Sequence, residues 1–84
     1  LMLYLGRKRL IITKSAYHEM NQLNMPVQGL ISAIEEGERA LESKRTGKWL
    51  AQARFGKKFT LVRYADLGDK IVVINIGQTT RKVI

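Results

Sequence analysis

A single histidine and a set of basic side chains are the residues of this chain best suited to chemistry. His18 can act as a general acid or base, because an imidazole gains and loses a proton near neutral pH. The sequence shows no partner that would orient the imidazole of His18, because its neighbour Glu19 points to another side of a helix. His18 is therefore a candidate catalytic residue, and a solvated helix residue is the alternative interpretation.

Basic side chains also accompany the predicted strands of the C-terminal half. The candidates for holding a phosphate are Arg45, Lys48, Arg54, Arg63 and Arg81. Aromatic side chains interleave with them, and stacking a base on an aromatic ring contributes about 1–3 kcal/mol. Trp49 and Tyr64 are the candidates for this role. We expect at least two of the strand aromatics, which also include Phe55 and Phe59, to pack in the core instead.

Charge separates along the chain. Lys and Arg outnumber Asp and Glu by 15 to 7, a formal net charge of +8. Residues 45–84 hold nine basic and two acidic residues, whereas residues 21–44 have a net charge of −2. A concentrated basic region suits a polyanion, because each phosphate that is neutralised releases counterions. We therefore expect a nucleic-acid partner, and charges that only keep a small protein soluble are the alternative.

Metal and cofactor chemistry have little support in the sequence. The chain has no cysteine and one histidine, so a metal site would need carboxylates. The clustered Glu35, Glu36, Glu38 and Glu42 are expected to form a solvated helix end. No Walker loop, GxGxxG, HExxH or CxxC motif occurs. We therefore expect neither a metal nor a cofactor.

No stretch predicts a membrane span or a secretory signal. No apolar run approaches the ~18 residues that a spanning helix needs. The apolar LMLYL of residues 1–5 precedes the basic GRKR, which is the reverse of the order in a secretory signal. We therefore expect no membrane partner and a reducing cytoplasm.

The N-terminal half predicts a strand followed by two short helices. Residues 9–13, RLIIT, are typical of a strand, and residues 1–5 form another strand or a frayed end. Either Thr13 or Ser15 can cap the first helix, because a hydroxyl accepts a free N–H group of the first turn. We expect Asn24 to end this helix, and Gly37 to end the second.

The period of apolar residues changes to two in the C-terminal half, which predicts strands. Gly56 and Lys57 suit a two-residue hairpin turn, and Gly77 is expected to end the last strand. The segment after Gly77 is a tail or an edge strand. The expected strands are residues 48–55, 58–65 and 70–76.

These strands predict which side chains share a face of the sheet. One face has an aliphatic centre and is expected to take the helices: Leu50, Gln52, Arg54, Phe59, Leu61, Arg63, Val72, Ile74 and Ile76. The other is expected to be the exposed binding face: Trp49, Ala51, Ala53, Thr60, Val62, Tyr64, Ile71, Val73 and Asn75. A slip of one residue would invert the assignment.

Together these elements predict one α+β domain over residues 1–84, with an N-terminal strand and a two-helix hairpin packed on a twisted antiparallel sheet. In element order, size and charge the chain resembles the RelE-like small toxins and their BrnT-type relatives. It is more similar to a group of small RelE-like domains whose first helix carries Thr-x-His-Ala-x-x-Arg-Met. Within TKSAYHEM, Thr13, Ala16 and Met20 match, whereas Ser15 and Glu19 replace the family's His and Arg. The stretches NMPVQGLISAIEEGE, RTGKW and KIVVINI match its second helix and strands.

The resemblance implies a RelE-like, metal-independent ribonuclease, in which the RNA 2′-hydroxyl is the nucleophile. In this interpretation Arg54 and Arg63 stabilise charge on the phosphate in the transition state, and His18 moves a proton. Tyr64 is a further catalytic candidate and, like Trp49, stacks a base. The nucleic-acid-binding set is Arg45, Lys48, Trp49, Arg54, Arg63 and Arg81. An acidic antitoxin is the implied protein partner, and the alternatives are a non-catalytic nucleic-acid-binding module and a small protein-interaction domain.

Overall fold

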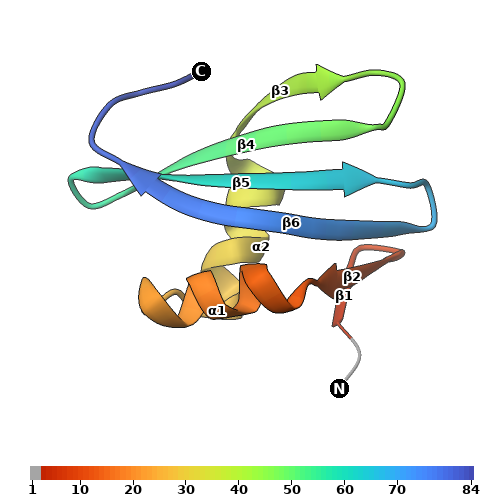
Figure 1. The fold of residues 1–84 in the computed structure, drawn as a ribbon, viewed down its shortest axis with the longest axis horizontal. Coiled ribbons are helices and arrows are strands. Elements are labelled where there is room, and N and C mark those ends of the chain that lie inside the picture. Colours follow the sequence, from red (N-terminus) through yellow and green to blue (C-terminus); the bar gives the residue numbers. More distant parts are fainter. Residues whose placement is uncertain (1–2) are drawn as a thin grey trace.

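The computed structural model describes residues 3–84, which form an α+β fold of two helices and a six-stranded sheet (Figure 1). In chain order the elements are β1 (Leu3–Leu5), β2 (Lys8–Ile12), α1 (Lys14–Gln22), α2 (Val27–Glu36), β3 (Glu38–Ser43), β4 (Lys48–Phe55), β5 (Lys58–Asp66) and β6 (Lys70–Thr79). The strands lie side by side in the order β1, β2, β6, β5, β4, β3. Neither helix in the described part of the chain is long and apolar enough to span a membrane.

The sheet is mixed, because β2 and β6 run parallel while all other neighbouring strands run antiparallel. The α+β class is therefore confirmed, and the prediction of a wholly antiparallel sheet is wrong at this one pair. Parallel strands cannot be joined by a tight turn, and the chain between β2 and β6 contains both helices. β6 is thus an interior strand that brings the N-terminal and C-terminal halves together.

The strands differ from the expectation most clearly at β3, β6 and β1. Residues 38–43 form the edge strand β3, although Glu38 and Glu42 were expected at a helix end. This segment is rich in helix-favouring residues, so pairing with β4 overrides local propensity. β6 continues past Gly77, because Thr79 still pairs with β5. The strand expected over residues 1–5 is observed at Leu3–Leu5, and residues 1–2 lie outside the described chain.

Helix α1 runs along the edge of β6 beyond the end of β2 (Figure 1). Thr13 caps it, accepting the backbone N–H of Ala16 at 3.2 Å, and also donates its hydroxyl to the carbonyl of Ile74. Glu19 accepts the backbone N–H of Ile76 at 2.9 Å. Two side chains of this region therefore satisfy backbone groups of β6 that no strand reaches. The helix ends as predicted, with Asn24 at a positive φ of 53°.

Helix α2 covers one face of the sheet, behind β4 to β6 in the view of Figure 1. Its Leu30, Ala33 and Ile34 are almost fully buried in the core. It ends at Gly37 as predicted, and a Cβ at that position would overlap the carbonyl oxygens of Ala33 and Gln52. The chain can therefore turn from α2 into β3, beside β4, only with glycine at this position.

The helices cover the face of the sheet that was predicted to be exposed. Ala51, Val62 and Tyr64 are buried among helix residues, whereas Arg54 and Arg63 lie on the exposed side. The face assignment made from the sequence is therefore wrong. Alternation separates two sets of residues but does not say which set a helix will cover. The small side chains of the buried set let α2 approach the strands closely.

The pairing of β4 with β5 agrees with the predicted hairpin. Phe55 pairs with Lys58 across the two-residue turn, where Gly56 has a φ of 63°. The register of β5 with β6 shifts between Arg63 and Tyr64. This bulge returns Ile76 to the core side, where the uninterrupted alternation did not place it.

Candidate nucleic-acid interface

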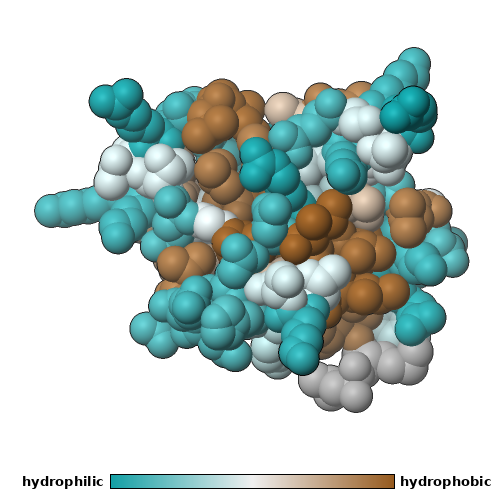
Figure 2. Space-filling model, in the orientation of Figure 1, coloured by the Kyte–Doolittle hydropathy of each residue, from teal (hydrophilic) through white to brown (hydrophobic). Residues whose placement is uncertain are grey.

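We call the face of the sheet opposite α2 the open face. It carries the residues that alternate with the buried set. These are Lys48, Leu50, Gln52 and Arg54 of β4, Phe59, Leu61 and Arg63 of β5, and Glu38 and Ala40 of β3. In Figure 2, which has the orientation of Figure 1, hydrophobic atoms form patches across the middle of this face and hydrophilic atoms surround them. An apolar surface with a charged margin is therefore left uncovered by the helices.

Three of the predicted phosphate-binding residues share the open face. Lys48, Arg54 and Arg63 are all exposed. Arg63 pairs with Leu50, which is the next residue after Lys48 on the same face of β4. Arg54 pairs with Phe59 at the other end of the hairpin, and its Nε donates to the carbonyl of Gly56 at 3.2 Å. The structure thus brings these cations onto one surface, spread along the length of the hairpin.

Arg63 already has a partner on this face. Its Nε donates to Oε1 of Glu42 at 3.0 Å and to Oε2 at 3.3 Å. The pair joins β5 to β3 over the intervening strand β4, and Leu50 of β4 is 6% exposed. Both side chains of the pair remain substantially solvated, so their attraction is screened and weak. A phosphate can compete for Arg63, because the arginine fork binds phosphate as well as carboxylate.

The segment after β6 covers another part of the open face. It folds back toward β3 (Figure 1), and the backbone N–H groups of Val83 and Ile84 donate to Oε1 of Gln52 at 2.6 and 3.0 Å. Lys82 forms an ion pair with Glu38 at 3.2 Å. Gln52 is consequently buried, and Arg81 of the predicted binding set lies in this covering segment.

The two aromatic candidates lie on the opposite side of the sheet from the cations. Trp49 and Tyr64 pair across β4 and β5 as the sequence predicted, but Tyr64 is 1% exposed. Trp49 is partly buried beneath Arg39, whose guanidinium carbon lies 5.4 Å from the ring centroid. Phe59 is the aromatic side chain that β5 presents on the open face, where it is partly exposed.

His18 lies on the side of α1 that faces away from the core. Ala16 and Met20 are the buried residues of this helix, and His18 falls halfway between them in sequence, on the opposite side. Glu19, the next residue, reaches β6. Within residues 3–84, His18 forms no ion pair or side-chain hydrogen bond. It is therefore solvated, on the helix that borders β6.

Arg45 lies in the turn between β3 and β4, away from the strand positions of the other cations. Two further basic residues belong to the open face and were not among the candidates. Arg9 of β2 pairs with Lys70 of β6 on the side opposite the buried Leu10 and Ile71. The parallel pairing of β2 with β6 places them there. A sequence pattern that reveals each strand separately does not reveal this pairing.

The described residues contain no cluster of three or more His, Cys, Asp or Glu side chains that could hold a metal ion. The open face itself carries guanidinium and ammonium groups and the ring of Phe59, beside the carboxylates of Glu38 and Glu42. The guanidinium and ammonium groups can bind phosphate, and the aromatic ring can stack a base, without a metal.

Comparison with protein-family models, with curated proteins and with solved structures finds no match to this chain.

Proposed function

We propose that this protein binds single-stranded RNA through the open face of its sheet. The observation that carries the proposal is the placement of Lys48, Arg54 and Arg63 on one exposed surface that the helices leave uncovered. Guanidinium and ammonium groups that share one surface can contact successive phosphates of a nucleic acid. The attraction between these charges does not depend on base sequence and supplies most of the affinity in such complexes.

The apolar part of the open face supports a single strand as the form of the RNA. Phe59 lies directly across from Arg54, and Leu61 lies between Phe59 and Arg63 along β5. Unpaired bases stack on aromatic and apolar surfaces, whereas the bases of a duplex are already stacked and turned inward. A strand that crosses the hairpin can place phosphates at the cations and a base on Phe59.

The resemblance to RelE-like toxins extends the proposal to RNA cleavage. The order of a strand, two helices and an antiparallel set of strands is compatible with that resemblance. In a metal-independent cleavage the RNA 2′-hydroxyl attacks the adjacent phosphorus, and the bond from phosphorus to the 5′-oxygen breaks to leave a 2′,3′-cyclic phosphate and a 5′-hydroxyl. Cations stabilise the negative charge that develops on the phosphate oxygens. Arg54 and Arg63 would stabilise that negative charge, and His18 would move a proton, taking it from the 2′-hydroxyl or giving it to the leaving 5′-oxygen.

An acidic antitoxin is the protein partner that this proposal implies. The solvated cations of the open face would attract acidic side chains as they attract phosphates. Such a partner would compete with RNA for the same surface, and its binding would weaken with salt in the same direction.

The salt dependence of RNA binding tests the proposal. The measurement is the dissociation constant for a fluorescein-labelled single-stranded RNA between about 50 and 200 mM salt. Three phosphate contacts predict that log K falls with log salt at a slope of about −2, because each contact on a single strand contributes about −0.7. A slope near zero would show that the protein does not contact the RNA phosphates directly.

Cleavage is tested separately, by incubating the protein with the same RNA and with ribosomal RNA in the presence of a chelator. Products from the wild type that are lost in His18→Ala and in Arg54→Gln would support catalysis. If the protein binds the RNA but does not cleave it, the protein is a non-catalytic RNA-binding module.

A further inference from the structure

The chain after β6 lies over the middle of the open face. We call residues 80–84 the strap, which is the segment that folds back toward β3 at the upper left of Figure 1. The backbone N–H groups of Val83 and Ile84 donate to Oε1 of Gln52, at 2.6 and 3.0 Å. Gln52 is 3% exposed, although it belongs to the face that the helices leave uncovered. The strap therefore covers a polar side chain that would otherwise be open to solvent.

Gln52 lies between the cations to which the proposed function assigns RNA phosphates. Arg54 is the next residue after Gln52 on the same face of β4, and Gln52 pairs across the hairpin with Leu61. Leu61 in turn lies between Phe59 and Arg63 along β5. The shortest path of an RNA strand from Arg54 to Arg63 therefore passes over the place that the strap occupies.

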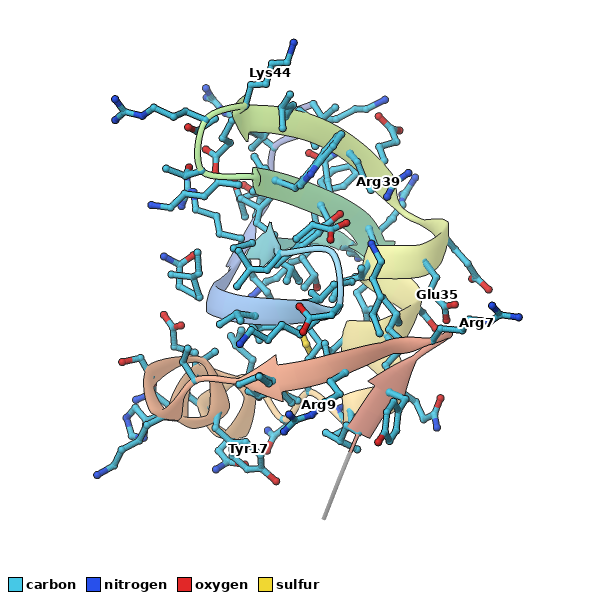
Figure 3. The ribbon with its side chains drawn as sticks, turned by 90° about the vertical axis from the view of Figure 1, so that its right-hand side faces the viewer. Arg7, Arg9, Tyr17, Glu35, Arg39 and Lys44 are labelled. Carbon is cyan, nitrogen blue, oxygen red and sulfur yellow. The ribbon has the colours of Figure 1, made fainter. Side chains whose placement is uncertain are left out.

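An ion pair with β3 also holds the strap. Nζ of Lys82 lies 3.2 Å from Oε1 of Glu38, and Glu38 pairs with Gln52 across β3 and β4. Adjacent residues of a strand point to opposite faces, and Figure 3 shows Arg39 on the side of the sheet where α2 lies. The edge strand therefore presents a carboxylate, and not a guanidinium, to the basic strap.

These contacts hold the strap weakly. Both side chains of the pair between Lys82 and Glu38 are more than half exposed, so solvent screens their attraction. The two hydrogen bonds converge on one amide oxygen, and each contributes little net stability because water can replace it. The side chain of Val83 is 55% exposed and buries little apolar surface. Because the pairing of β6 with β5 ends at Thr79, the strap can leave the sheet without disturbing a strand.

RNA would bind the protein more tightly with the strap displaced. A ligand shifts an equilibrium between two states only by its difference in affinity for them. When the strap leaves, the surface around Gln52 and Leu61 becomes available to the bases. Lys82 can also exchange the carboxylate of Glu38 for a phosphate of the RNA. Both changes favour RNA on the state in which the strap is open.

We propose that the strap is an autoinhibitory segment, which closes the middle of the open face in the free protein and is displaced when single-stranded RNA binds. This regulation rests on the proposed function, because it concerns the same RNA surface. Only molecules with an open strap bind RNA in this scheme. The apparent affinity is therefore lower than the intrinsic affinity by the fraction of molecules that are open.

Two substitutions at Val83 test the strap in the full chain. Val83→Pro removes the N–H group that donates to Gln52 at 2.6 Å, and it leaves the net charge and the open-face residues unchanged. Fluorescence anisotropy with the labelled single-stranded RNA should show that Val83→Pro binds about three- to tenfold more tightly than the wild type, because a closed state held by modest hydrogen bonds is lost. Val83→Ala keeps the N–H group and is the matched control, so its RNA affinity should equal that of the wild type.

Amide hydrogen exchange, measured by NMR on the isotope-labelled chain, follows the strap itself. In the free wild type the N–H groups of Val83 and Ile84 should exchange about three- to tenfold more slowly than in an unstructured peptide of the same sequence, because the same fraction of open molecules governs exchange and RNA binding. Val83→Pro should remove the protection of Ile84, and Val83→Ala should keep it. Saturating RNA should remove the protection of both amides in the wild type.

The outcomes separate the strap from the RNA surface. If RNA binds the wild type and Val83→Pro equally well, the strap does not inhibit binding and the regulation is overturned while the proposed function stands. The same holds if the two amides exchange freely in the free wild type or stay protected at saturating RNA. If RNA binds none of the three proteins while the amides are protected, the proposed function and its regulation are overturned together.

Discussion

Arg63 of β5 and Glu42 of β3 form an ion pair with 3.0 Å between Nε and Oε1, above the strand that separates them. The pair holds a cation of the open face in place and also reduces the positive charge that RNA would meet there. Because both side chains are solvated, the contact contributes little to folding. We therefore expect the ion pair of Arg63 with Glu42 to affect RNA binding more than stability.

Removing the carboxylate should strengthen RNA binding. Glu42→Gln releases Arg63 and deletes one negative charge from the open face, so we expect the dissociation constant to fall about three- to tenfold at low salt. Fluorescence anisotropy with labelled single-stranded RNA measures it. Glu36→Gln, which makes the same charge change on α2, is the control. An equal increase in RNA affinity in both variants would indicate that only the net charge of the protein matters, and that RNA does not bind specifically at the open face.

The contact between Glu19 and β6 predicts a stability effect. Glu19→Ala leaves the backbone N–H of the buried Ile76 without its acceptor, which should lower the free energy of unfolding by about 1–3 kcal/mol. Urea denaturation measures the change. Glu19→Gln keeps an acceptor oxygen and should recover most of it, and His18→Ala, on the solvated side of α1, should change stability by less than about 0.5 kcal/mol. No loss in Glu19→Ala would show that water replaces the carboxylate.

The covered face of the sheet is tested by two aliphatic truncations. Leu30 is 0% exposed, so Leu30→Ala should cost about 2–5 kcal/mol of unfolding free energy. Ile74 lies at the bulge, is partly exposed and is outside the buried core, so Ile74→Ala should cost clearly less. Chemical denaturation of both variants gives the comparison. If Ile74→Ala were the more damaging change, the helices would cover the other face.

The ion pair of Lys8 with Asp66 predicts a pH dependence. The usual pKa of this carboxyl is 3.8, and the hydrogen-bonded Lys8 lowers it in the folded chain. The pair therefore stabilises the fold above about pH 4, and this contribution is lost as the pH falls through the lowered pKa. The difference in unfolding free energy between wild type and Asp66→Asn should shrink from pH 6 to about pH 3 and below. Asp69→Asn, at an exposed residue of the same turn, should show a smaller change.

Local chemistry made much of the fold predictable. The Thr13 cap, the ends of both helices at Asn24 and Gly37, and the Gly56 turn all depend on residues close in sequence. Strand alternation also placed Arg54 and Arg63 on a common face. What alternation leaves open is which face a helix will cover, and that depends on how closely α2 can approach the small side chains of β4.

The remaining differences come from contacts between distant segments. Residues 38–43 favour a helix locally and become a strand only because β4 is beside them. The pairing of Arg9 with Lys70 requires β2 to meet β6 in parallel.

The most direct test of the central claim compares two arginine variants that carry the same change in net charge. Arg54→Gln removes a cation from the open face, and Arg7→Gln removes one from the turn between β1 and β2. For single-stranded RNA, Arg54→Gln should weaken binding across all sequences and reduce the salt slope by about 0.7, whereas Arg7→Gln should leave both nearly unchanged. Equal losses in the two variants, or no loss in Arg54→Gln, would contradict RNA binding at the open face.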